Sequence, residues 1–319
     1  MSGHDSTALS THLTRTNLWS GQVKEILMDI LQGQAYVSWM TEFPDGTTFN
    51  IPSIGEIPMR NVAENDAVVY DEIDTGNFTF TIDKYVEAAT FITDKAKQDS
   101  YYANTLIAGF VPKMKRAIEE NLETNIFALV TGQTASDLNT INGGDHRFVA
   151  SGNTNTTLAL ADFAKAKFAL DKANATQRRV AIIDPSQEYV LNNLTGIVDV
   201  TYNPKFEGIV TEGFVNSTTG MRFSKNVYGF DVYVSNYLHT VTGTETINSI
   251  ASPSGAVCNV FMSVGGDESP FKGAWRQMPN VEFERNKDLR RDEYVLNARY
   301  GLKLYRPECL VTILSKNTI

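Results

Sequence analysis

Residues 292–307 have the sequence DEYVLNARYGLKLYRP. From Tyr294 to Leu304 an apolar side chain falls on almost every second position, and polar side chains such as Asn297 lie between them. This alternation is typical of a β-strand with one buried face, here sustained for eleven residues. A second apolar run, residues 310–314, follows at once. The sequence therefore predicts two closing strands that need another element to cover them.

A long helix upstream is the expected cover. Apolar residues recur in steps of four from Leu106 to Val130, and Gly132 ends the run. Because Pro112 lies inside this stretch, we expect either a kink or a junction between two helices there. The closing strands are expected to pack on this helix and to complete a domain that the middle of the chain interrupts.

The middle of the chain has the pattern of an α/β unit. Its predicted elements are a helix at 158–173, a buried strand at 178–185, a short helix at 186–194, and strands at 228–238 and 257–264. Thr156 or Thr157 is the expected N-cap of the first helix. The dipeptide Asp184-Pro185 is expected to stop the buried strand.

The N-terminal part has two segments that do not look self-contained. Residues 1–16 are polar and resemble an arm, and a short amphipathic helix is predicted after them, up to Gly33. Residues 41–92 predict a long two-stranded excursion, in which prolines such as Pro52 favour an edge or a projection over a central strand. A projecting hairpin and an arm together suggest a subunit that its neighbours complete.

Composition sets broad limits on function. The chain has 319 residues, 42% of them hydrophobic, and a formal net charge of −9, which excludes a general attraction for nucleic acid but leaves local basic patches open. No secretory signal is visible, and no apolar run is long enough for an ordinary membrane-spanning helix. Cys258 and Cys309 stand in apolar surroundings, which predicts two buried thiols in a reducing compartment.

The sequence contains no motif that predicts catalysis. The four histidines are scattered, and none of them clusters with cysteine at metal-ligand spacing. Neither a nucleophile elbow nor a phosphate-binding glycine loop is present, and the glycine pairs at 143–144 and 265–266 are typical of turns. We therefore expect no catalytic residues, no cofactor and no metal. An enzyme would need a site assembled from dispersed residues.

Charge is distributed unevenly along the chain. Residues 41–77 hold eight acidic side chains, a single arginine and no lysine, whereas RNKDLRR (285–291) places four bases in a predicted turn. The candidate contact residues are Glu56, Arg60, Glu64, Asp66, Asp71, Glu72, Arg285, Lys287, Arg290 and Arg291. Two interpretations stay open. The two segments are unrelated solvated surfaces, or the acidic hairpin of one subunit docks on the basic turn of the next.

Four stretches in this order resemble the major capsid proteins of tailed phages, which have the shell fold named after phage Hong Kong 97. They are residues 61–100, 178–194, 226–238 and 291–313, which include the dipeptide Tyr300-Gly301 and the tripeptide Arg306-Pro307-Glu308. Each motif is weak by itself, and their order and spacing carry the resemblance. It covers about residues 17–317.

The resemblance implies an α+β fold of the Hong Kong 97 type. Its parts would be an N-terminal arm (1–40), an extended β-hairpin loop (41–77), a peripheral domain with a long spine helix (78–140 and 262–319) and an axial α/β domain (141–261). The extended loop would lie over the peripheral domain of the next subunit.

The resemblance also implies function and partners. Copies of the chain would assemble as hexamers and pentamers into an icosahedral shell around packaged double-stranded DNA, in the host cytoplasm. A portal, decoration or cement proteins, and a separate scaffolding protein would be partners, the last because only a short arm precedes Leu18. No membrane partner is expected. The rival interpretations are an encapsulin-type bacterial compartment, a soluble hydrolase, and a tail or fibre component, which should show β repeats that this chain lacks.

Two features of the chain refine this expectation. Some relatives seal the shell with a lysine–asparagine isopeptide bond whose lysine comes from the extended loop, and residues 41–77 contain no lysine, so no such crosslink is expected by that route. The acidic balance of the chain predicts only weak, non-specific contact with the packaged DNA, because a wall that binds phosphates tightly would hinder movement of the genome.

Overall fold

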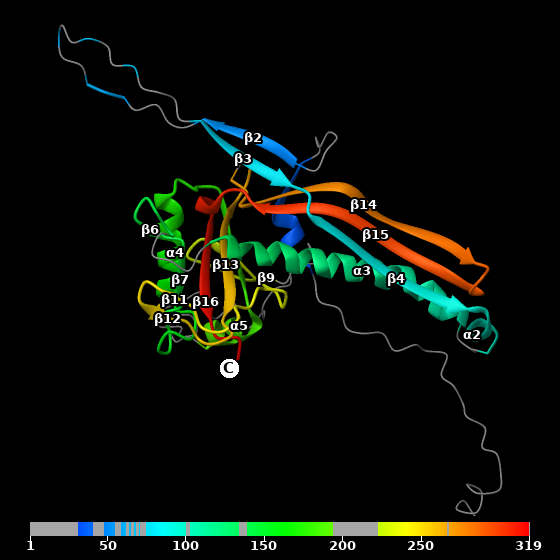
Figure 1. The fold of residues 1–319 in the computed structure, drawn as a ribbon. Helices are drawn as coiled ribbons and strands as arrows, with labels where there is room; N and C mark the ends of the chain where they lie inside the picture. The colour runs from blue at the N-terminus through cyan, green and yellow to red at the C-terminus, as the bar shows by residue number, and fades with distance from the viewer. Residues whose placement is uncertain are drawn as a thin grey trace, which may run out of the picture.

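Two β-sheets and one long helix organise the subunit (Figure 1). The computed structural model describes residues 31–40, 48–54, 59–61, 64, 67, 70, 75–99, 103–133, 139–193, 223–266 and 268–318. The predicted helix before Gly33 and most of the predicted arm lie outside these residues. The mixture of sheets and helices confirms the predicted α+β class.

The strand predicted from DEYVLNARYGLKLYRP lies inside a four-stranded sheet of order β1-β14-β15-β4. Its strands are β1 (Val37–Met40), β14 (Phe271–Asn286), β15 (Arg291–Leu304) and β4 (Lys84–Thr93). β15 pairs antiparallel with both β14 and β4, and β1 runs parallel to the start of β14. Leu296, Ala298 and Tyr300 are buried on one face of β15, which confirms the predicted half-buried strand.

The long helix covers that buried face. It consists of α3 (Ala103–Ala128) and the 3-10 turn η2 (Leu129–Gly132), and α2 (Asp94–Asp99) precedes it. Met114 and Ile118 of α3 belong to one apolar cluster with residues of β15. The hydroxyl of Tyr300 donates to Asn121 Oδ1 at 3.1 Å, so the polar end of this buried ring has a partner on the helix. The helix ends at Gly132 as predicted.

Pro112 does not divide the helix. α3 is assigned without interruption across it, so the alternative of a junction between two helices at this position is wrong. A proline removes one backbone hydrogen bond and crowds the preceding turn. Pro112 itself is exposed.

The second sheet has six strands in the order β7-β16-β13-β8-β10-β9. They are β7 (Arg147–Val149), β16 (Leu310–Ser315), β13 (Val257–Val264), β8 (Arg178–Ile183), β10 (Phe230–Val234) and β9 (Phe223–Val227). The helices are α4 (Leu160–Lys172) and α5 (Pro185–Asn192), and short pieces are η1 (Gly33–Tyr36), β5 (Thr140–Ile141), β6 (Gly144–Asp145), β11 (Thr246–Ile247), β12 (Ile250–Ala251) and η3 (Pro307–Cys309).

Both faces of the six-stranded sheet are covered. On one face, Phe163 and Leu170 of α4 pack in a cluster with Phe261 of β13. On the other, Val260 of β13 shares a cluster with Ile126 near the end of the long helix. Strands buried on both faces are continuously apolar, which is why the sequence of β13 showed no alternation.

The second closing strand lies in this sheet. β16 pairs antiparallel with β13 and parallel with β7, and not with the long β15 as their adjacency in sequence suggests. Two of its residues, Leu310 and Leu314, nevertheless share the apolar cluster of the end of the long helix. The predicted boundary at residue 262 falls inside β13. The division into peripheral and axial domains stays a prediction.

The expected N-cap of α4 is wrong. The helix begins at Leu160, after Ala159, so neither Thr156 nor Thr157 caps it. Instead the carboxylate of Asp162 accepts the N–H of Ala159 at 2.9 Å and that of Ser151 at 3.0 Å. A buried carboxylate in the first turn therefore binds the amide that immediately precedes the helix and also ties the helix start to Ser151.

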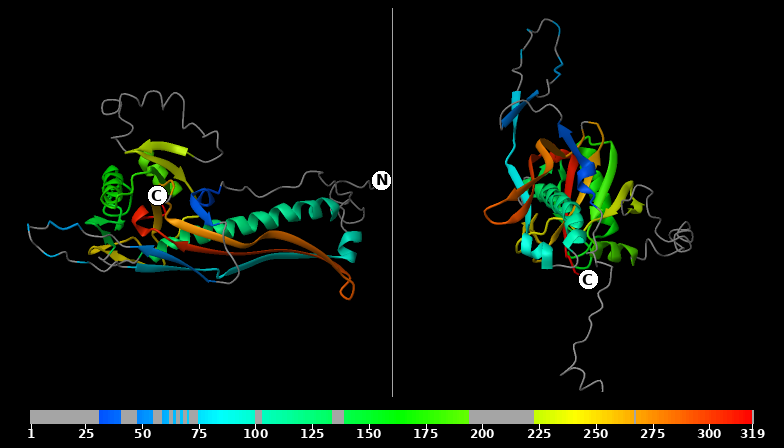
Figure 2. Two further views of the ribbon diagram at one scale, coloured as in Figure 1. Left: turned by 90° about the horizontal axis from the view of Figure 1, so that it is seen from above. Right: turned by 90° about the vertical axis from the view of Figure 1, so that its right-hand side faces the viewer.

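A two-stranded hairpin projects from the body, as Figures 1 and 2 show. β2 (Thr48–Ile54) pairs antiparallel with β3 (Thr75–Thr81). The predicted excursion ends earlier than residue 92, because β4 belongs to the long sheet, where Val86 and Ala88 pack toward α3. None of the described helices is long and apolar enough to span a bilayer.

Candidate inter-subunit contact surfaces

The hairpin and the turn between β14 and β15 lie at opposite ends of the subunit, a relation visible in both figures of the whole chain (Figures 1 and 2). We call the turn, residues 287–290, with the neighbouring ends of β14, β15, β4 and α2, the tip. The structure brings the four predicted bases together at the tip. It does not bring them near the hairpin of their own chain.

Local hydrogen bonds shape the tip. Asn286 Oδ1 accepts the N–H of Asp288 and the N–H of Leu289, each at 3.2 Å, which closes the turn. Arg290 has a φ of 49°, in the left-handed region, and its carbonyl accepts the N–H of Asp94 at 3.0 Å. The start of α2 is therefore attached to the turn.

Carboxylates of the same subunit hold two of the four bases. The guanidinium of Arg285 donates to Asp94 at 2.8 and 3.0 Å and to Asp292 at 2.9 Å. Lys97 of α2 also pairs with Asp292. Hydrogen bonds from Arg285 lower the pKa of Asp94, and those from Lys97 and then Arg285 lower the pKa of Asp292. Neither carboxylate was predicted from the sequence, although each lies at the start of an element next to the turn, Asp94 in α2 and Asp292 in β15.

Arg291 is the second base held locally. Its Nε donates to Glu293 at 2.6 Å, and its guanidinium carbon lies 4.5 Å from the centre of the Phe91 ring. Within the described part of the chain, no ion pair involves the side chain of Lys287 or Arg290, and the charge of Arg290 lowers the pKa of Asp94 without a side-chain hydrogen bond. Lys287 and Arg290 are therefore the bases available to a second chain.

Apolar side chains surround these bases. Phe283 and Leu289 are 59% and 56% exposed, and Phe91 on the adjacent strand is 55% exposed. Large apolar residues beside unpaired bases on one protruding end are typical of a surface that another protein covers.

The hairpin end of the subunit is described only in part. Arg60 and Glu64 are exposed, as are Met59 at 99% and Tyr70 at 89%. Glu56, Asp66, Asp71 and Glu72 lie outside the described residues. The predicted contact between the acidic hairpin and the basic turn stays a prediction.

The base of the hairpin is attached firmly to β15. Lys303 Nζ donates to the carbonyl of Thr79 at 2.5 Å and lies 4.7 Å from the centre of the Phe78 ring. That ring meets Tyr305 edge-on at 5.0 Å. A Cβ on Gly301 would lie 2.6 Å from the carbonyl oxygen of Thr81, so glycine is required for this close approach. These contacts set the direction in which the hairpin leaves the body.

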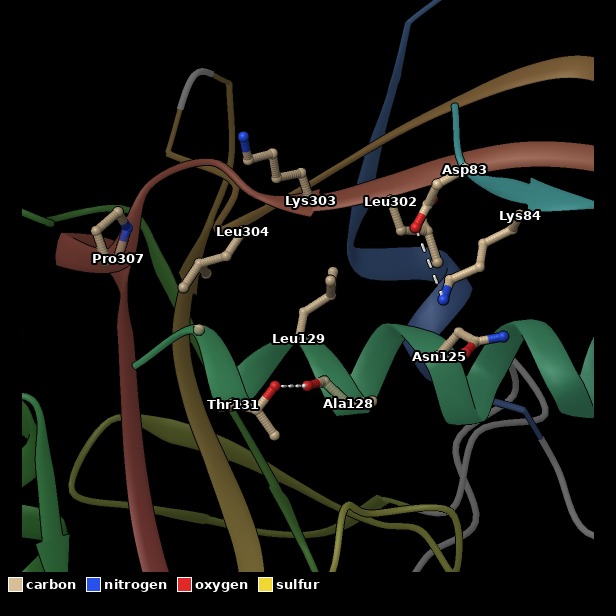
Figure 3. Close-up of a pocket in the computed structure, with 11 residues that line it drawn as sticks. Asp83, Lys84, Asn125, Ala128, Leu129, Thr131, Leu302, Lys303, Leu304 and Pro307 are labelled. Atoms are coloured by element: carbon tan, nitrogen blue, oxygen red, sulfur yellow. Dashed lines mark hydrogen bonds and ion pairs between the residues drawn. The ribbon is translucent and has the colours of Figure 1, made fainter. Parts of the chain in front are cut away.

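A groove lies between the end of the long helix and β15 (Figure 3). Its lining residues are Asp83, Lys84, Asn125, Ala128, Leu129, Thr131, Gly132, Leu302, Lys303, Leu304 and Pro307. The lining contains neither histidine nor cysteine, and its closest charged pair is Lys84 with Asp83 at 3.8 Å. Among the described residues, no group of His, Cys, Asp and Glu could hold a metal ion. The groove has no constellation for nucleophilic or metal-assisted chemistry.

A long helix under a four-stranded sheet, a six-stranded sheet beside it and a projecting hairpin define the class: a capsid shell protein with the Hong Kong 97-type fold. The family model described as "Phage capsid protein" matches residues 76–313, and the chain belongs to this family. It is a structural protein of the virion capsid that associates with copies of itself, and neither the encapsulin nor the hydrolase alternative receives support.

Solved structures share the fold at low sequence identity. The capsid structure of cyanophage P-SCSP1u aligns with a TM-score of 0.69 at 16% identity, over 98% of this chain and 95% of that one. The mature capsid of bacteriophage PhiM1 aligns with a TM-score of 0.68 at 12% identity, over 96% and 93%. The chain of Mycobacterium phage Che8 aligns with a TM-score of 0.63 at 14% identity, over 94% and 96%. No curated protein matches the chain in sequence.

Proposed function

We propose that the chain is the shell-forming subunit of a tailed double-stranded DNA phage, and that it assembles as hexamers and pentamers into a closed icosahedral shell. The observation that carries the proposal is the separation of the hairpin from the tip in a chain of the phage capsid family. Complementary surfaces at opposite ends of one subunit cannot satisfy each other within that subunit. They form head-to-tail contacts, which generate closed rings when the rotation between copies closes.

Charge supports the same arrangement. Between residues 41 and 77 the sequence holds eight carboxylates and one arginine, and the tip presents Lys287 and Arg290. Opposite potentials on two protein surfaces steer their encounter and fix their register more than they add affinity. The hairpin of one copy docks near the tip of the next, and the apolar side chains at the tip supply the area that the contact buries.

The proposed partners follow from this function. They are a separate scaffolding protein, a portal, decoration or cement proteins, and packaged DNA held by weak non-specific contacts. Assembly takes place in the host cytoplasm. Because residues 41–77 contain no lysine, no isopeptide crosslink forms from the hairpin.

Expression of the chain, alone and with a scaffolding protein encoded beside it, tests the proposal. We expect closed shells with five-fold and six-fold capsomers, measured by sedimentation velocity and electron microscopy. A protein that stays monomeric under both conditions would contradict it. Nucleic acid content in particles purified from infected cells separates a phage shell from a compartment that encloses proteins.

A further inference from the structure

Glu123 is a buried carboxylate that none of the surfaces above uses. It lies on α3, on the side that faces the segment 32–36, and its side chain has no exposed area. A buried carboxylate without hydrogen-bond donors is costly, so its partners are informative.

Three consecutive backbone amides converge on this carboxylate. Its Oε1 accepts the N–H of Gln32 at 2.7 Å and that of Gly33 at 2.5 Å, and its Oε2 accepts the N–H of Gln34 at 3.3 Å. A Cβ on Gly33 would lie 3.1 Å from Oε2 and 3.2 Å from the Phe127 ring, so the backbone approaches the helix at the distance that glycine allows. We call this arrangement the Glu123 clamp.

The other side of the clamped segment is attached to the six-stranded sheet. Gln32, also fully buried, donates from Nε2 to the carbonyl of Val234 in β10 at 2.6 Å. The ring of Tyr36 lies 6.2 Å from that of Tyr233 in the same strand. Residues 32–36 are therefore held between the long helix and the second sheet, and β1 continues from them into the first sheet.

The clamp fixes the point at which the N-terminal residues join the folded body. Residues 1–30 are joined covalently to a segment whose backbone position and direction the carboxylate fixes through main-chain groups. Hydrogen bonds to successive amides specify an orientation that contacts to one side chain would not.

We propose that Glu123 is a positioning residue for shell assembly, which fixes the position and the direction of the backbone at residues 32–34 between the long helix and the six-stranded sheet. This inference rests on the proposed function.

Substitution of Glu123 by Met tests the inference, because Met has a similar length and no oxygen acceptor. We expect hydrogen exchange at the amides of Gln32, Gly33 and Gln34 to become at least about tenfold faster, while amides in the six-stranded sheet keep their protection. The yield of closed shells per folded subunit should fall by at least about tenfold. The matched control is Glu119→Met, one turn earlier on the same helix and partly exposed, which should change neither quantity.

Two further variants keep the test decisive if Glu123→Met does not fold. Glu123→Gln retains an oxygen for the two shorter hydrogen bonds and should assemble normally, whereas Gly33→Ala crowds the clamp from the other side and should reduce assembly. If the amides of residues 32–34 exchange rapidly in a variant that still gives the wild-type yield of shells, the inference is overturned and the proposed function is left intact. A wild-type chain that forms no shell would instead contradict the proposed function, and the exchange measurement would still report on the clamp.

Discussion

Two carboxylates of this subunit have pKa values displaced in opposite directions. At the tip, Lys97 and Arg285 stabilise the charged form of Asp292 and lower its pKa. In the clamp, burial is the largest effect on Glu123 and raises its pKa, although three backbone amides favour the charged form. The same residue class therefore responds to acid differently at the two places.

The clamp predicts an unusual pH dependence of stability. Because its folded-state pKa is raised, Glu123 binds a proton in the native state before it does so in the unfolded chain as the pH falls. The ionised form of Glu123 therefore lowers the free energy of unfolding. This loss is recovered as the pH falls through the folded-state pKa. Arg116 of the same helix is the charged group that opposes this effect.

We expect the unfolding free energy of the wild type, relative to Glu123→Gln, to rise as the pH is lowered from neutrality to below the pKa of an unfolded glutamate, about 4.3. Denaturant unfolding of both proteins at each pH measures this difference. A relative stability that falls over the same interval would show that the amides, and not burial, dominate the pKa.

The two thiols provide a second prediction at this scale. Cys258 and Cys309 are buried and free, as the sequence predicted, and burial raises the pKa of each to about 11. The thiolate is the reactive form, so neither should react with a maleimide at pH 8 while the subunit is folded. Both should label completely in denaturant. Rapid labelling of the native protein would contradict the burial of these side chains.

At the scale of elements, periodicity predicted β15 and the long helix well. The alternation from Tyr294 to Leu304 identifies a buried face, and the steps of four ending at Gly132 identify its cover. The pairing of β16 could not be read from its sequence, because a strand buried on both faces shows no alternation that distinguishes one sheet from another. The role of Asp162 in the first turn of α4 was not predicted, because threonine before a helix and aspartate in its first turn both suit a helix start, and only packing decides between them.

The close approach of β15 to the hairpin base gives a prediction for an element. Gly301→Ala places a Cβ against the carbonyl of Thr81 and the Cα of Ile82, both backbone atoms that cannot move without the strand. We expect a loss of about 1–3 kcal/mol of unfolding free energy. Gly132→Ala is the control, since its Cβ meets only the flexible side chain of Leu304 and should cost less than about 1 kcal/mol. Thermal or denaturant unfolding measures both, and equal losses would refute the backbone clash.

At the scale of the whole molecule, the separation of hairpin and tip decides how copies meet. The tip presents fewer bases than the sequence suggests, because Arg285 and Arg291 serve their own subunit. Charge-based docking therefore depends on Lys287 and Arg290, and the exposed apolar side chains around them supply contact area.

Reversal of charge at these two positions tests the docking. The double substitution Lys287→Glu and Arg290→Glu should slow assembly by about tenfold at low salt, and added salt should narrow the difference from wild type. Light scattering during assembly measures the rate. Lys172→Glu, on the exposed side of α4, is the control and should assemble at the wild-type rate. Wild-type kinetics in the double variant would remove charge steering from the mechanism.

Local period, residue type and spacing were enough to predict the half-buried strand, its covering helix and the basic turn, whereas the α+β class was implied by the family resemblance of four stretches in order. Three features could be seen only in the tertiary structure. β16 joins the second sheet, Arg285 pairs with Asp94 and Asp292 of its own subunit, and the buried Glu123 accepts three backbone amides. These features depend on which segments distant in sequence come into contact. The sequence does not show whether a given carboxylate is solvated by water or bound by backbone amides.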